Sequence, residues 1–269
     1  MNNRSQKNAK YDSVDIHKQP AFDHILLKNH KIQIGPNSLP KPKNTNLKFN
    51  NYPHLESTDE GCPKGKVPIQ RLKVDNLTDV IHPLTETAPG KHFAVAKSNV
   101  FKKIYGASAT IGLNTPHAKM NQISAATIWI EGKSVQLLSG LKVEKDKSTG
   151  HWWVTLENNI HLGYWPEKLF TVFGCGANSV QFDGWTYGYP DGMSPPMGTG
   201  YFPTTNNLKQ SSFFLNLKYV DDLGVLQDAH RLRQVADISN CYDAIYLGHK
   251  NRVNEQILTF GGPGGQCDL

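Results

Sequence analysis

Eleven histidines and four cysteines raise the question of a metal site in this chain of 269 residues, but their spacing fits none. No two histidines are four residues apart, no HExxH motif occurs, and no cysteines form a CxxC pair. His151 and His161 fall on adjacent predicted strands, but no third ligand accompanies them. The GxSxG motif of many serine hydrolases is also absent. We therefore expect no metal, no cofactor and no catalytic triad.

The second group of candidate residues is aromatic and lies mostly in one block, HWWVTLENNIHLGYWPEKLF at 151–170. Exposed rings could form a platform for polysaccharide or peptide, whereas buried rings build a core. Because aromatic residues of a β-rich protein are more often core, we expect Trp152 and Trp153 to serve the core first and a cleft second. The whole set comprises Trp152, Trp153, Trp165, Trp185 and Tyr187.

The elements that position these residues are predicted to be strands. Positions 152–156 alternate between two faces with the period of a strand, and an Asn-Asn turn precedes a return strand. The 23 glycines and 16 prolines separate many short apolar runs, which is typical of a β-sandwich. Within 212–220, Leu215, Leu217 and Tyr219 are expected on one face, with Asn216 and Lys218 opposite. Short helices are expected only at 98–105 and 166–170. The strand candidates are 92–96, 107–113, 123–130, 135–143, 151–156, 160–164, 179–182, 211–220, 242–247 and 257–260.

Positive charge is concentrated at the N-terminal end of the chain. The formal net charge is +6, of which residues 1–73 carry +7 and residues 74–269 carry −1. The chain has no basic helix, zinc-finger spacing or aromatic RNA-binding motif, so we expect a solvated basic segment and no nucleic-acid partner. No apolar run reaches bilayer length, so we expect no membrane span. The start, MNNRSQKNAKYDS, is polar and has no apolar run, so we do not expect it to be a signal peptide.

Several motifs follow one another along the chain in a recognisable order. They are DIHKQPAFDHILLKNHKIQIG at 15–35, CPKGKVPIQR at 62–71, HFAVA at 92–96, KDKSTGHWWV at 145–154, LGYWPEKLF at 162–170, MGTGYF at 197–202, NCYD at 240–243 and TFGGPGGQC at 259–267. The first two resemble the activation peptide, and the others the catalytic domain, of the neprosin family of secreted plant endopeptidases with a preference for proline. The resemblance implies an all-β fold, an antiparallel β-sandwich preceded by an extended, partly ordered pro-segment. We divide the chain into a pro-segment at 11–73, a linker at 74–90 and a catalytic-like sandwich domain at 91–269.

The resemblance also implies the mechanism of glutamic peptidases, in which two carboxyl groups face one another across a cleft. One carboxylate activates a water for attack on the scissile carbonyl, and the other carboxyl donates a proton. Because two like charges at close range cannot both ionise easily, their pKa values separate and their roles divide. The implied partners are a peptide or protein substrate, including proline-rich ones, and the chain's own pro-segment. The implied location is extracellular.

The chain departs from the family at the second catalytic glutamate, which the family places in a Val-x-x-Gly-Gly-Glu tract after the YWP block. The aligned tract is VQFDGW at 180–185, so Trp185 occupies the glutamate position. Tryptophan has an N–H donor but no titratable group, so it cannot transfer the proton. Asp183 lies two residues back on the same face, but its shorter side chain starts from a displaced backbone position. We expect Trp185 and Tyr187 to line the cleft, with Trp152 and Trp153 as its further walls.

A second departure is an apparent deletion near 131–134. In the family, a strand like ISAATIWI is followed by the segment with the first catalytic glutamate, a Gly-Trp strand and a Cys-rich loop. Here IEGK at 130–133 runs almost directly into SVQL at 134–137. Glu131 is the only carboxylate near the junction, and we interpret it as a turn residue beside Gly132. The loss of strands is expected to expose an edge unless neighbouring strands close the gap.

The cysteines are interpreted through the same resemblance. Cys241 and Cys267 occupy the family's two C-terminal cysteine positions, which implies a disulfide; the alternative is two reduced thiols in a cytosolic chain. Cys62 belongs to the pro-segment motif, and Cys175 is interpreted as a buried or incidental thiol.

The sequence thus predicts a neprosin-type, proline-directed glutamic endopeptidase by resemblance, inactive or very weakly active as written, and so a pseudoenzyme. One alternative is a non-catalytic extracellular binding module for proline-rich protein or cell-wall glycan, which saturable binding without cleavage would support. The other is the product of an incomplete gene model or splice form, which the transcript across 133–134 would reveal.

Overall fold

The computed structural model describes residues 11–38, 62–63, 65–70, 89–98, 103–119, 122–131, 136–139, 142–156, 160–170, 173–188, 193–205, 207, 210–248 and 256–267. Two compact units divide the chain, and each is described by itself. The first comprises Met1–Ile34 with Asn46–Thr85, and the second Gly35–Thr45 with Glu86–Leu269.

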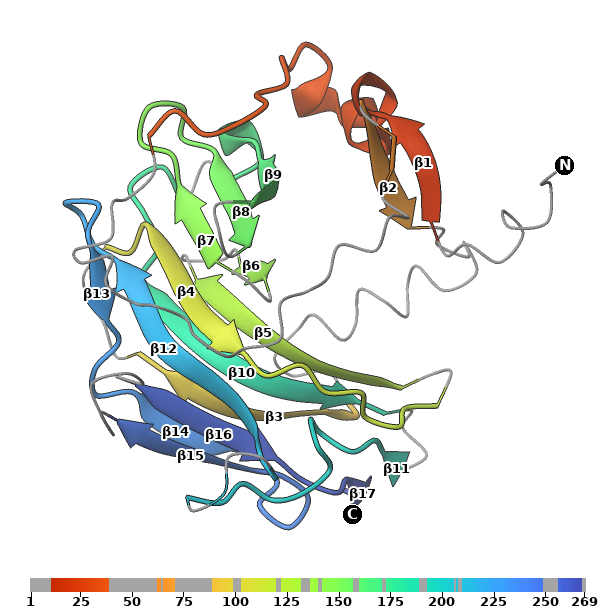
Figure 1. The fold of residues 1–269 in the computed structure, drawn as a ribbon, viewed down its shortest axis with the longest axis vertical. Helices are drawn as coiled ribbons and strands as arrows, with labels where there is room; N and C mark the ends of the chain where they lie inside the picture. Colours follow the sequence, from red (N-terminus) through yellow and green to blue (C-terminus); the bar gives the residue numbers. More distant parts are fainter. Residues whose placement is uncertain are drawn as a thin grey trace, which may run out of the picture. The chain divides into compact units, whose positions relative to one another are not determined.

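The first unit contains one strand pair and a short helical stretch (Figure 1). Strand β1 (Tyr11–Asp15) pairs antiparallel with β2 (Lys66–Gln70), so segments far apart in the sequence lie side by side. Three 3₁₀ turns follow β1, namely η2 (Ile16–Lys18), η3 (Pro20–Asp23) and η4 (Ile25–Leu27). Within this stretch Leu27 is buried, whereas its neighbours Ile25 and Leu26 are exposed.

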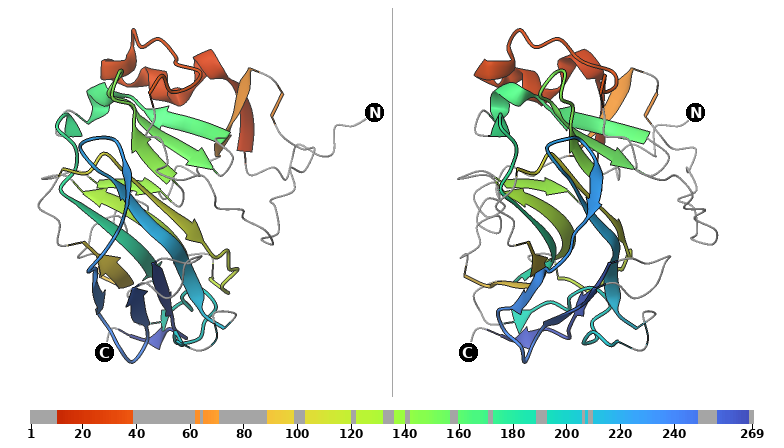
Figure 2. Two further views of the ribbon diagram at one scale, coloured as in Figure 1. Left: turned by 60° about the vertical axis from the view of Figure 1, so that its left-hand side comes forward. Right: turned by 90° about the vertical axis from the view of Figure 1, so that its left-hand side faces the viewer.

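The second unit is built from two antiparallel sheets and a short strand pair (Figures 1 and 2). The first sheet has the strand order β14 (Arg233–Ala236), β3 (Lys91–Lys97), β10 (Ser179–Tyr187), β5 (Ile123–Glu131) and β6 (Gln136–Ser139). The second has the order β15 (Asp243–Gly248), β16 (Ile257–Gly261), β12 (Ser212–Val220), β4 (Gly106–Ile111), β7 (Lys142–Lys145), β8 (Trp152–Leu156) and β9 (Ile160–Trp165), with β13 (Leu226–Asp228) beside β12. The short pair is β11 (Met193–Ser194) with β17 (Gly265–Gln266).

The two sheets pack face to face around one apolar core. Strands β10 and β12 supply facing aromatic rings, since the Phe182 and Phe214 ring centroids are 6.1 Å apart. Phe260 of β16 lies 5.3 Å from Phe214 in the same layer. The predicted all-β, antiparallel sandwich is therefore confirmed. Further fully buried members of this core include Ala94, Ala96, Ile128, Ile130, Trp152, Leu217 and Leu258.

Three details of the strand prediction are wrong. The candidate 135–143 is two strands in different sheets, because β6 pairs with β5 whereas β7 pairs with β4 and β8. The candidate 179–182 continues to Tyr187, since β10 is a central strand paired on both sides. In β12 the regular alternation fails at a bulge around Asn216, whose φ is +55°. Phe214 and Leu217 therefore reach the core.

Short helical structure is found only in part where it was predicted. The turn at 166–170 is confirmed as the 3₁₀ turn η8 (Glu167–Leu169). Of the predicted helix at 98–105, residues 99–102 lie outside the described residues, and Ile104 forms an isolated bridge with Ala177 instead. The junction at 132–135 likewise lies outside the described residues. After it, β6 pairs with β5 at the edge of its sheet.

Candidate functional site on the five-stranded sheet

The tract that holds Trp185 runs through the middle of the five-stranded sheet. Trp185 lies opposite Phe93 of β3 and Ala125 of β5. Between Asp183 and Trp185, Gly184 faces the core, because a Cβ added there would lie 2.1 Å from the Phe260 ring. Asp183 and Trp185 therefore point to the opposite side, which we call the outer face. The outer face comprises Lys91, Phe93, Val95 and Lys97 of β3, Ile123, Ala125, Thr127, Trp129 and Glu131 of β5, and Ser179, Gln181, Asp183, Trp185 and Tyr187 of β10.

Trp185 belongs to an aromatic and cationic cluster on this outer face. The Lys91 ammonium lies 4.7 Å from the ring centroid of Trp129 and 5.2 Å from that of Trp185. Both indole rings are buried, at 3% and 5% exposure, and neither Nε1 has a hydrogen-bond acceptor among the described residues. A cation over indole faces is stabilising, but the cluster offers no carboxyl group. The position expected for a catalytic acid thus holds a ring packed against an ammonium group.

Glu131, the carboxylate nearest the apparent deletion, is held by three partners. Its carboxylate accepts a hydrogen bond from Ser179 Oγ at 2.5 Å and another from Gln181 Nε2, and Lys97 Nζ lies 2.9 Å away. Burial raises the pKa of Glu131, but the bonds from Ser179, Lys97 and Gln181 outweigh it and hold the pKa below its usual value. Instead of lying in a turn, Glu131 is the last residue of β5. It is an ionised structural carboxylate.

The register of the sheet keeps Glu131 and Asp183 apart. Glu131 lies opposite Ser179, whereas Asp183 lies opposite Thr127, which is four residues earlier on β5. Four residues of an antiparallel strand span about 13–14 Å. Paired catalytic carboxyls that share a proton lie about 3 Å apart. The structure therefore does not bring these two acids together as a catalytic pair.

We expect Glu131→Gln to lower the free energy of unfolding at pH 7 by about 1–3 kcal/mol, the usual value for hydrogen bonds to a charged group. Because the folded pKa lies below the unfolded value of 4.5, this stabilisation is present above pH 4.5 and is lost as pH falls through the folded pKa. Urea unfolding at pH 7 and near pH 3 should therefore show a shrinking difference between variant and parent. Asp222→Asn, at an exposed carboxylate, is the control. A difference that stays constant with pH would contradict this assignment.

The predicted cleft aromatics lie in different environments. Trp152 is in the core, with its ring centroid 5.5 Å from that of Phe173. Trp153 is also buried but faces the other side of β8, where it packs on Tyr164 at 4.7 Å. Tyr187 is half-buried at the end of β10. Since β8 and β10 belong to different sheets, Trp152 and Trp153 do not form one platform with Trp185. Tyr187, by contrast, lies two residues from Trp185 on the same face of β10.

Glu144 is an ionisable residue that sequence reasoning missed. It lies opposite Trp153 on β7 and is fully buried, and Lys142 Nζ lies 2.8 Å from its Oε1. Burial raises the pKa of Glu144 above its usual value, although Lys142 opposes the shift. A raised pKa is a property of catalytic acids, but this carboxyl has no exposed surface and lies in the other sheet from Trp185. No periodic signal in the sequence distinguishes it from an exposed strand acid.

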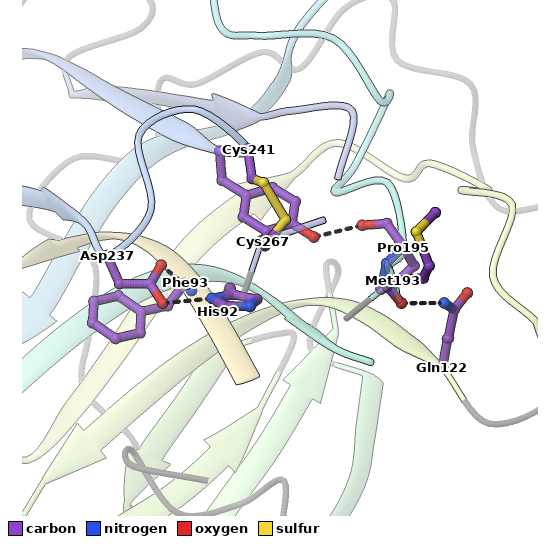
Figure 3. Close-up of a disulfide and its surroundings, with 9 residues drawn as sticks. His92, Phe93, Gln122, Met193, Pro195, Asp237, Cys241 and Cys267 are labelled. Carbon is purple, nitrogen blue, oxygen red and sulfur yellow. Dashed lines mark hydrogen bonds and ion pairs between the residues drawn. A yellow bond between two sulfur atoms is a disulfide. The ribbon is translucent and has the colours of Figure 1, made fainter. Parts of the chain in front are cut away.

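Cys241 and Cys267 form a disulfide, as the resemblance implied (Figure 3). Beside it, Tyr242 Oη donates a hydrogen bond to the Pro195 carbonyl at 2.7 Å. The loop before Cys241 is fixed to β3 through Asp237, which accepts from the Phe93 N–H and lies 2.9 Å from His92 Nδ1. The disulfide thus joins the loop at Cys241 to the C-terminal end of the described residues. Cys62 and Cys175 are free, and Cys175 is exposed, which is not the buried position considered for it.

The described residues contain no group of three or more histidine, cysteine or acidic side chains that could hold a metal ion. Among the same residues, no helix is long and apolar enough to cross a membrane.

The fold and the aligned tracts define a class of protein, a β-sandwich domain with an N-terminal activation segment. The family model described as Neprosin matches residues 118–263, and the model described as Neprosin activation peptide matches residues 3–99. Because the first match alone covers more than half of the chain, the protein belongs to the neprosin family. Its second unit is accordingly a peptidase-like domain, and its N-terminal part corresponds to the family's own activation peptide.

Proposed function

We propose that this protein is a secreted, non-catalytic member of the neprosin family. In this proposal, residues 11–73 are the pro-segment, 74–90 a linker and 91–269 the domain that has lost proline-directed glutamic peptidase activity. The observation that carries it is Trp185, which we align with the family's second glutamate and which lies on β10, packed against Lys91. Neither side chain can take a proton from a water at neutral or acidic pH.

Three other acidic residues, Glu131, Asp183 and Glu144, do not replace the family's catalytic pair of glutamates. Glu131 is engaged by Ser179, Gln181 and Lys97, so its carboxylate is already satisfied. Asp183 lies opposite Thr127, which is four residues from Glu131 on β5. The two carboxyl groups are therefore too far apart to bind one water between them. Glu144 is fully buried and in the other sheet. General acid–base help of this kind is commonly worth about 10²–10⁴-fold in rate, so its loss leaves little activity.

We expect Trp185→Glu, which restores the family's residue, to leave the protein inactive toward proline-containing peptides. One restored carboxyl cannot perform both roles, because the segment with the first glutamate has no counterpart. The measurement is peptide cleavage at acidic pH after removal of the pro-segment, with Trp185→Gln as the uncharged control. Turnover by Trp185→Glu but not by Trp185→Gln would show that a first acid is present, and would overturn the proposal.

A second candidate function is binding of proline-rich peptide without cleavage. It is favoured by the Nε1 atoms of Trp129 and Trp185, which have no acceptor among the described residues. Both atoms are buried, so a peptide reaches them only after the side chains that cover them move. Peptide carbonyls are suitable acceptors, and prolines supply carbonyls without competing N–H groups. Titration of the pro-segment-cleaved protein with a proline-rich peptide should saturate. Trp185→Phe, which keeps a ring but removes the N–H, should weaken that binding. Equal affinity in parent and variant would exclude this role for Trp185.

A further inference from the structure

A pocket of about 580 Å³ lies outside the candidate site described above. It is formed by the segment after β4, including Asn114 and His117, by the turn around Thr199 and Tyr201, and by Pro263 after β16. The first of these segments connects β4 to β5, and the turn lies between β11 and β12. None of its ten lining residues is Lys, Arg, Asp or Glu. The pocket is therefore suited to a ligand without formal charge.

Two of the polar side chains that line this pocket, Asn114 and Thr199, are fixed as hydrogen-bond acceptors. Asn114 Nδ2 donates to the Gly112 carbonyl at 3.2 Å and to Ser212 Oγ at 2.9 Å. Because a carbonyl can only accept, the atom beside Gly112 is the amide nitrogen, and both of its N–H groups are used. Asn114 Oδ1 remains as an acceptor. Thr199 Oγ1 gives its only proton to the Gln210 carbonyl at 2.8 Å and accepts from the Tyr201 N–H at 3.4 Å, so one lone pair of this hydroxyl remains for a ligand.

The remaining surface of the pocket is aromatic and apolar. Tyr201 is 68% exposed, so its ring face is open to a ligand, and Pro116, Pro196 and Pro263 add apolar surface. Binding pockets combine such a surface with a few fixed polar groups that orient the ligand. Only ligands that bring hydrogen-bond donors satisfy acceptors of this kind, because an acceptor left unpaired on binding costs free energy.

We propose that this pocket binds a neutral saccharide unit. The hydroxyl groups of a sugar donate to Asn114 Oδ1 and Thr199 Oγ1, and the C–H face of its ring lies on Tyr201. A proline-rich peptide fits less well, because proline has no N–H to donate. An acidic sugar is disfavoured, because the lining holds no Lys or Arg side chain to pair with its carboxylate. This inference does not depend on whether the domain cleaves peptides.

The test is an NMR titration of the full chain with neutral hexasaccharides of glucose, xylose, mannose or galactose. A hexamer of galacturonic acid and a proline-rich peptide serve as competing ligands. We expect at least one neutral hexasaccharide to shift the amide signals of Gly198 and Gly200 saturably. Tyr201→Ala and Thr199→Val should each weaken that binding about tenfold or more. Leu223→Ala, at a side chain 79% exposed outside the pocket, is the matched control and should bind as the parent does.

Three results would overturn the proposal. The first is that no neutral hexasaccharide shifts these signals. The second is that the galacturonate hexamer or the proline-rich peptide is the ligand that binds there. The third is unchanged affinity in Tyr201→Ala. Because Tyr201 is largely exposed, its replacement is expected to leave the fold intact, which the unshifted amide signals of the core will report.

Discussion

Replacement of both Cys241 and Cys267 by alanine is expected to lower the free energy of unfolding by about 3 kcal/mol. The disulfide joins residues 26 positions apart, and the chain-entropy account assigns about this value to a loop of that length. Its loss also frees the C-terminal end from the loop that carries Tyr242, whose hydroxyl is bonded to Pro195. Urea unfolding of the oxidised parent and the double variant measures the difference.

The control for this prediction is the free, exposed thiol Cys175. Cys175→Ala should unfold at the same urea concentration as the parent, because it closes no loop. Surface substitutions that are neutral change the free energy of unfolding by about 0.5 kcal/mol or less. A double variant within that range of the parent would contradict the stabilising role of the disulfide.

Lys142→Met is expected to cost about 3–5 kcal/mol of unfolding free energy at pH 7, because it leaves the buried Glu144 carboxylate without its counter-ion. Lys142 is the only partner of that carboxylate among the described residues. Burial already raises the folded pKa of Glu144 above its unfolded value of 4.5. The folded protein therefore favours the neutral form of Glu144. The resulting contribution to the free energy of unfolding is fully present below pH 4.5 and is lost as pH rises through the folded pKa. The cost of Lys142→Met should accordingly shrink when unfolding is measured near pH 4.

Two variants give this second prediction its controls. Lys142→Met combined with Glu144→Leu removes both charges, and should recover most of the stability, since a buried ion pair is often replaceable by apolar residues. Lys168→Met, at an exposed lysine, should be near neutral. A cost that is unchanged at low pH, or that persists in the double variant, would show that Lys142 stabilises through packing of its stem and not through its charge.

Local patterns were sufficient to predict most of the sandwich. Alternation predicted β8 and β9 on either side of a turn, and the apolar runs predicted β3, β5 and β16. The division of 135–143 between two sheets could not be predicted, because each half alternates equally well and only the pairing of β6 with β5 separates them. The bulge at Asn216 is also a tertiary effect: its N–H donates to the Gln256 carbonyl, 40 residues further along.

The environment of the candidate site could not be predicted from the sequence. The motif order placed Trp185 at an acid's position, and the structure places it on a central strand. The contact of Lys91 with the Trp185 ring joins residues about 90 positions apart in the sequence. No local sequence pattern predicts such a contact. The partners of Glu131 could not be predicted either, because Ser179 and Gln181 come from another strand, β10. The buried pair of Glu144 with Lys142 could not be predicted, because an acidic residue on a strand is usually exposed.

The most direct test of the central claim is the cleavage rate of proline-containing peptides at acidic pH by the protein from which the pro-segment has been removed. We expect a rate indistinguishable from that of the peptides in buffer alone, and unchanged in Glu131→Gln and Asp183→Asn. Measurable turnover by the parent that either substitution abolishes would contradict the account, because it would show that this chain retains a working catalytic carboxyl.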